Sequence, residues 1–152
     1  MTDTPAPVRE VNDKTRENWQ GKINALAEKY NVPCAAITRL RLPKIENFIL
    51  NQSEDNPAKA GHIGRITGSY CGHVIDTNET LHVPDALSDP DWDQNPDVKI
   101  NLIAYLGLPL LNPDGTPFGT ICILDDRENQ FDGDQEETLR QMKAEFEADL
   151  AE

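Results

Sequence analysis

The sequence predicts an α+β domain built around an antiparallel β-sheet. Three observations support this fold class: an amphipathic pattern at each end of the chain, two pairs of consecutive strand-like segments with short links, and a short helix and long loop between those pairs. Short links favour antiparallel pairing of neighbouring strands. We therefore expect the terminal helices to cover one face of the sheet, and the middle loops and short helix to cover the other.

The first helix is expected to begin between Val8 and Asp13 and to end at Tyr30. Asn31 follows, and asparagine readily adopts the left-handed conformation that ends a helix. Pro33 then prevents the helix from continuing. The apolar residues of this segment recur at helical spacing, and they are Trp19, Ile23, Leu26, Ala27 and Tyr30.

The segment after Pro33 is rich in β-branched and apolar residues, with a break at Leu42-Pro43-Lys44. Such composition favours two antiparallel strands. The residues that follow have the composition of a loop. In chain order we expect strands over about residues 33–41 and 45–51, a loop over 53–67, a short helix from Thr67 or Ser69 through Asp76, and a strand over 80–85.

A long acidic segment, residues 86–101, separates these elements from a hairpin. Long loops in compact domains are usually functional or disordered. The hairpin strands are expected over residues 103–111 and 117–125. Their connector, Asn112-Pro113-Asp114-Gly115, ends in the Asp-Gly pair that is typical of hairpin turns.

The last helix is expected to begin at Asp132, which forms the pattern of a capping box with Gln135. Its apolar side chains make one narrow stripe, and a narrow stripe suits packing against another helix. We expect the two terminal helices to form a homodimer interface. The candidate interface residues are Trp19, Ile23, Leu139, Met142, Phe146 and Leu150.

Length and charge limit the classes of function. The 152 residues fit one domain over 8–152, preceded by a disordered tail over 1–7. The formal net charge is −13, and the acidic excess lies in residues 71–152. An acidic surface repels phosphate backbones and anionic lipids, so we expect neither a nucleic-acid nor a membrane partner. Without a long apolar run or a signal pattern, a cytoplasmic protein is expected.

Three segments resemble a GAF domain from about Asn31 to the last helix. They are GSYCGHVI with ETLHVPDALSDPDWDQNPDV, LIAYLGLPLLNPDGTPFGTICILDD, and the final amphipathic helix. The resemblance implies a twisted antiparallel sheet of five to six strands, with the terminal helices on one face and a roofed pocket on the other. It also implies a small-molecule-sensing input module of a bacterial-type signal-transduction protein, such as a histidine kinase, a cyclic-di-GMP enzyme or a regulator.

The expected pocket takes its residues from the roof segments and from one face of the hairpin. Strand alternation places Tyr105 on the face opposite Leu106 and Leu108, and it places Thr120 and Cys122 together. Aromatic rings with a few polar groups are typical of small-molecule pockets. The candidate ligand-binding residues are Tyr70, Cys71, His73, Asp85, Trp92, Tyr105, Thr120 and Cys122.

No cofactor is expected, because the chain departs from the better-defined GAF subgroups. It has no Asn-Lys-X-Phe-Asp-Glu signature of cyclic-nucleotide binding, and Gly72 interrupts the Cys-His pair that tetrapyrrole-binding members use. No metal is expected either, because the histidines and cysteines lack paired ligand spacing. Three well-separated cysteines also do not make a disulfide framework, so reduced thiols are expected.

A thiol-dependent enzyme is the first alternative. The element Gly68-Ser-Tyr-Cys71-Gly72 resembles one in free methionine-(R)-sulfoxide reductases, which also need a cysteine in the loop after Val-Pro-Asp. Residues 86–101 contain none, and helical residues two apart, such as Cys71 and His73, diverge by about 200°. We therefore expect no catalytic residue and no enzyme. A ligand-free dimerisation module is the second alternative.

Overall fold

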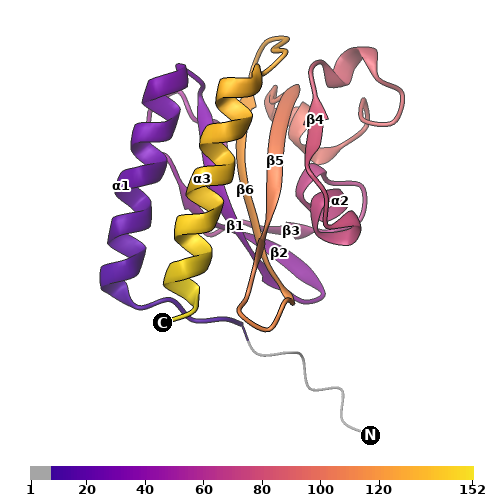
Figure 1. Ribbon diagram of the computed structural model, residues 1–152. Coiled ribbons are helices and arrows are strands. Elements are labelled where there is room, and N and C mark those ends of the chain that lie inside the picture. Colours follow the sequence, from indigo (N-terminus) through magenta and orange to yellow (C-terminus); the bar gives the residue numbers. More distant parts are fainter. Residues whose placement is uncertain (1–7) are drawn as a thin grey trace, which may run out of the picture.

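A six-stranded antiparallel sheet forms the centre of the molecule, as the sequence predicts (Figure 1). The computed structural model describes residues 8–152, so the predicted tail over 1–7 lies outside the described residues. The strand order is β3-β2-β1-β6-β5-β4. The strands are β1 Cys34–Arg41, β2 Lys44–Leu50, β3 Ile63–Arg65, β4 Leu81–Val83, β5 Ala104–Leu111 and β6 Pro117–Asp125.

The helices divide between the two faces of the sheet. The long terminal helices α1 (Asp13–Tyr30) and α3 (Gly133–Leu150) lie side by side on one face (Figure 1). The other face is covered by α2 (Tyr70–Thr77) and by two short 3-10 helices, η1 (Ala86–Ser88) and η2 (Pro96–Ile100). This arrangement confirms the predicted α+β fold class. No helix in residues 8–152 is long and apolar enough to cross a membrane.

The predicted helix signals act as caps. Asn31 ends α1 in the left-handed region, with φ 51° and ψ 49°. Asp132 and Gln135 form the expected capping box at the start of α3. Ser69 caps α2, because its hydroxyl accepts a hydrogen bond from the Gly72 amide at 3.0 Å. Local side-chain chemistry therefore sets where these helices begin and end.

Alternation along the hairpin produces two separate apolar layers. Leu106, Leu108 and Leu110 of β5 belong to the layer beneath α1 and α3. Tyr105 and Cys122 belong to the opposite layer, beneath α2. The predicted assignment of the hairpin faces is thereby confirmed, and Cys122 is placed on the face where a pocket was expected.

The residues predicted for a dimer interface are instead core residues of the protomer. Trp19, Ile23, Leu139 and Phe146 are each 0% exposed, Leu150 is also buried, and only Met142 is partly buried. The narrow apolar stripes of the helices face the sheet, so the sheet rather than a second subunit covers them. The terminal helices are also joined to each other: the Trp19 indole N–H donates to the Asp149 carboxylate at 2.8 Å.

The sequence did not predict β3, which lies inside the expected loop over 53–67. Its three residues pair with Lys44, Ile45 and Glu46 of β2 at the edge of the sheet. A strand of this length carries no alternation that a pattern search can recognise. The position of β3 matters for function, because it holds the loop before it against the sheet edge.

Candidate functional site

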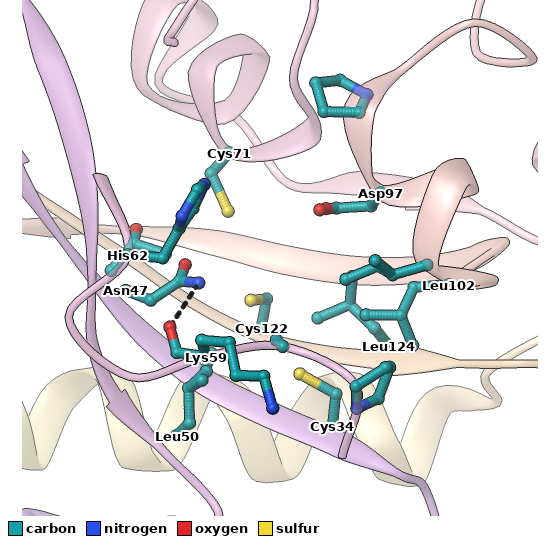
Figure 2. A pocket seen from close by; sticks show the side chains of 16 residues that line it. Cys34, Asn47, Leu50, Lys59, His62, Cys71, Asp97, Leu102, Cys122 and Leu124 are labelled. Carbon is teal, nitrogen blue, oxygen red and sulfur yellow. Dashed lines mark hydrogen bonds between the residues drawn. The ribbon is translucent and has the colours of Figure 1, made fainter. Parts of the chain in front are cut away.

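A cavity of about 250 Å³ lies between the sheet and its roof (Figure 2). Its floor comes from β1, β2 and β6, and its walls come from α2, η2 and the loop before β3. The residues that line it are Cys34, Ala36, Thr38, Asn47, Leu50, Pro57, Ala58, Lys59, His62, Cys71, Pro96, Asp97, Ile100, Leu102, Cys122 and Leu124.

The pairing register of β1 with β6 decides which side chains form the floor of the cavity. Ala36 of β1 is paired with Cys122 of β6, and Cys34 is paired with Leu124, so all four side chains point to the same face. Three of them are small. Small side chains on neighbouring strands leave space above the sheet, which larger residues at these positions would fill.

Ionisable side chains lie in the walls of the cavity. Asp97 points inward from η2, and His62 and Lys59 belong to the opposite wall (Figure 2). Burial raises the pKa of the Asp97 carboxyl to about 6, and the charge of His62 offsets this only in part. A carboxyl with this pKa is mostly ionised at neutral pH and takes up a proton under mildly acidic conditions, so its charge responds to pH and to a bound cation.

The three cysteines converge on this cavity although they are far apart in the sequence. Cys71 points down from α2, while Cys34 and Cys122 rise from the floor (Figure 2). Burial raises the pKa of the Cys34 thiol. The neighbouring Cys71 together with burial raises the pKa of Cys122 well above its usual range. All three are free thiols.

Cys71 differs from the other two thiols. Hydrogen bonding from Cys122, and then from Thr120 and Tyr105, lowers the pKa of Cys71, although burial acts in the opposite direction. Its Sγ lies 3.3 Å from the Thr120 hydroxyl and 3.4 Å from the Tyr105 hydroxyl. Cys71 therefore loses its proton more readily than the other two thiols of the cavity.

Of the eight ligand-binding residues expected from the sequence, Cys71 and Cys122 line the cavity. Thr120 and Tyr105 are fully buried beside them and touch Cys71. Tyr70 is also fully buried, and its hydroxyl donates to the Leu102 carbonyl at 3.1 Å. These three residues support the cavity from behind rather than line it.

The other three expected residues lie elsewhere. His73 and Trp92 line a separate depression outside α2, where their rings meet edge to face with centroids 5.3 Å apart. Asp85 caps η1 through a hydrogen bond from the Leu87 amide. Cys71 and His73 do point in different directions, because two-residue spacing on a helix separates them. His73 and Trp92 are therefore not part of the cavity.

Sequence reasoning missed most of the polar lining. Asn47, Lys59, His62 and Asp97 come from three segments, and none is part of a spacing motif. Asp97 lies in the long acidic segment, residues 86–101, from which no inward-pointing carboxyl was expected. Its position after Asn95, whose side chain accepts from the Asp97 amide at 2.9 Å, was the one available signal of a local turn there.

No group of three or more His, Cys, Asp or Glu side chains within residues 8–152 is arranged to hold a metal ion. The lining of the cavity combines thiols, one carboxyl, one imidazole, one amine, the Asn47 amide, the Thr38 hydroxyl and aliphatic side chains. Such a lining suits a compact organic molecule with polar groups at its ends.

A comparison with models of known protein families shows which family the chain belongs to. A family model of the GAF domain matches residues 23–148. The chain belongs to the GAF domain family. The match includes every strand of the sheet, α2 and both 3-10 helices, so the cavity lies wholly inside the GAF domain.

Solved structures agree on the fold. The GAF domain of a phosphoenolpyruvate-protein phosphotransferase from Coxiella burnetii is similar with a TM-score of 0.73 and 14% identity, covering 93% of this chain and 84% of that chain. A type II free methionine-R-sulfoxide reductase from Thermoplasma acidophilum is similar with a TM-score of 0.72 and 17% identity, and the match covers 91% of this chain and 93% of that chain.

A far-red cyanobacteriochrome photoreceptor is similar as well, with a TM-score of 0.70 and 12% identity over 91% of this chain and 88% of that chain. These structures come from proteins of different kinds, so the likeness establishes the fold and leaves the activity open. No curated protein matches the chain significantly.

Proposed function

We propose that this GAF domain is a sensory module that binds a small polar molecule in the cavity and acts as the input of a signal-transduction protein. One observation carries the proposal: a cavity of about 250 Å³ lies between sheet and roof and has an inward-pointing carboxyl, Asp97. Burying a carboxyl reduces the stability of the folded protein unless a partner compensates for it. A ligand with a donor or cationic group supplies that compensation.

The size and the side chains of the cavity limit the size and the polar groups of a ligand. The cavity is smaller than the pockets that hold drug-sized molecules, which begin at about 300 Å³. Asp97 favours an ammonium or another hydrogen-bond donor, and Lys59 and His62 on the opposite wall favour an acceptor or an anion. Leu50, Leu102 and Leu124 line the cavity with aliphatic surface. A compact molecule with opposite polar ends fits this arrangement.

The sheet connects the cavity to the terminal helices. Cys122 of β6 faces the cavity, whereas its neighbours Ile121 and Ile123 pack in the layer beneath α1 and α3. A ligand that shifts β6 therefore acts on both layers. We propose that the helices transmit this shift, and that they do so in a homodimer built from their outer surfaces. Light scattering of concentrated protein tests the dimer, and a monomer at all concentrations refutes it.

Thermal-shift screening tests the ligand proposal. Amino acids, small amines and small carboxylic acids are added to the wild-type chain and to Asp97→Asn, with Asp91→Asn as a control for the loss of one negative charge from the same segment. A ligand that binds only the folded state raises the melting temperature. We expect a shift in wild type and Asp91→Asn that decreases in Asp97→Asn. The absence of any shift in wild type contradicts the proposal.

A thiol-dependent enzyme is the second candidate, and the position of Cys71 in the cavity wall favours it. Against it, residues 86–101 lack the cysteine that free methionine-(R)-sulfoxide reductases need in this loop. A turnover assay with free methionine sulfoxide and a dithiol reductant distinguishes the two functions. Turnover that disappears in Cys71→Ser supports the enzyme, and its absence in wild type supports the sensor.

A further inference from the structure

We propose that Cys71 is a nucleophilic thiol that reduces small hydroperoxides entering the cavity, and that Cys122 then closes a disulfide with it. The proposal goes beyond ligand sensing and does not depend on it, because hydrogen peroxide itself is the reactant. Four features of the structure carry it: the donors around the sulfur, the way they are positioned, the helix terminus, and the adjacent second thiol.

Two hydroxyl groups are directed at the sulfur. The Thr120 amide donates to the Thr38 hydroxyl at 3.1 Å, and the two threonine hydroxyls lie 2.6 Å apart. Since Thr38 already accepts from the backbone, its own proton can be donated to the Thr120 oxygen. This leaves the Thr120 proton to donate to Cys71 Sγ at 3.3 Å. The backbone amide at one end of this chain holds both threonine hydroxyls in place beside the sulfur.

The second donor, the Tyr105 hydroxyl, is positioned by a glycine. The tyrosine ring folds over Gly107, where a Cβ would overlap the ring and its hydroxyl. From there the hydroxyl lies 3.4 Å from Cys71 Sγ. The Tyr105 ring also stacks on the Tyr70 ring, with ring centroids 4.6 Å apart. Gly107 and Tyr70 together hold the donor in place, so little reorganisation is needed as charge develops on sulfur.

The N-terminus of α2 also favours ionisation of Cys71. Cys71 is the second residue of α2, after the N-cap Ser69, and the first turn of this helix contains no acidic residue. The partial positive charge at a helix N-terminus stabilises a thiolate. Asp97 opposes it from the cavity wall, and it is the weakest of the influences on the pKa of Cys71, which is lowered overall.

The second thiol completes the chemistry. Cys122 lies beneath Cys71 in the same cavity, on the face of β6 that also carries Thr120, whose hydroxyl contacts Cys71 Sγ (Figure 2). In the first step the Cys71 thiolate attacks one oxygen of hydrogen peroxide. The O–O bond breaks, hydroxide leaves, and Cys71 becomes a sulfenic acid, oxidised by two electrons. In the second step Cys122 sulfur attacks Cys71 sulfur, the S–O bond breaks, and water leaves with the Cys122 proton.

Peptide mapping tests the reaction. Trypsin places the cysteines in three different peptides, residues 30–39, 66–99 and 100–127. After treatment with hydrogen peroxide and alkylation without reductant, we expect a disulfide between 66–99 and 100–127 that dithiothreitol reverses. Cys122→Ser should instead leave a sulfenic acid on Cys71 that dimedone traps. A disulfide that includes 30–39, or unreacted Cys71 after exposure, overturns the proposal.

A pair of matched variants tests the donors separately. Tyr105→Phe removes the hydroxyl near Cys71, whereas Tyr70→Phe removes one that donates to the Leu102 carbonyl. We expect iodoacetamide to alkylate Cys71 about threefold more slowly in Tyr105→Phe than in Tyr70→Phe, because one donor to the thiolate is lost. Circular dichroism checks that both variants are folded. Equal alkylation rates in the two folded variants refute the positioning of the thiol by Tyr105.

Discussion

Replacing Asp97 with asparagine should stabilise the protein, and more so as the pH rises. The pKa of Asp97 is about 6 in the folded protein because burial disfavours its charged form. In an unfolded chain an aspartate titrates near about 3.9. Between these values the folded state holds a proton that the unfolded state has lost. The Asp97 contribution to stability therefore falls as the pH rises through this window.

The magnitude follows from the shift. One pKa unit corresponds to about 1.4 kcal/mol, so a shift of about two units corresponds to about 3 kcal/mol in total. Roughly two-thirds of that develops between about pH 4.5 and about pH 7.5. Asparagine carries no charge at either pH. We expect the free energy of unfolding of Asp97→Asn, relative to that of wild type, to rise by about 2 kcal/mol between the lower and the higher pH.

Urea unfolding followed by tryptophan fluorescence measures this difference. The control Asp91→Asn removes an exposed carboxylate from the same acidic segment. Its free energy of unfolding relative to wild type should change far less with pH. A relative stability of Asp97→Asn that does not rise between the two pH values would show that Asp97 is not held in a desolvated position, and the reasoning about the cavity wall would then fail.

Three further changes test the packing around the site. Gly107→Ala places a methyl group against the Tyr105 ring and should lower the free energy of unfolding by about 1–3 kcal/mol, which the urea midpoint measures. Trp19→Ala empties the centre of the helix layer and should cost about 3–5 kcal/mol; a loss below about 1 kcal/mol would contradict its burial. Asp132→Ala removes the α3 cap and should cost about 1 kcal/mol by thermal unfolding, whereas no change would argue against the capping box.

The part of the site that could be predicted is the part that depends on local patterns. Alternation along the hairpin places Cys122 on the cavity face, and a short helix after Ser69 carries Cys71 toward it. His73 and Trp92 lie outside this cavity, because helix position alone does not say which face of α2 is turned to the sheet. The residues expected at a dimer interface pack in the core of the protomer for a related reason: an apolar stripe shows that a side chain is covered, and only the fold shows by what.

The sequence by itself determined the helices, most of the strands and their faces, because caps, turns and periodicity act over a few neighbouring residues. The ends of α1 at Asn31 and the start of α3 at Asp132 are of this kind. Only the tertiary structure decided that Cys34, Cys71 and Cys122 meet in one cavity with Asp97. That meeting requires β1 to lie beside β6 and the acidic segment to fold back over both. Such long-range pairing depends on the packing of the whole chain, and no local spacing records it.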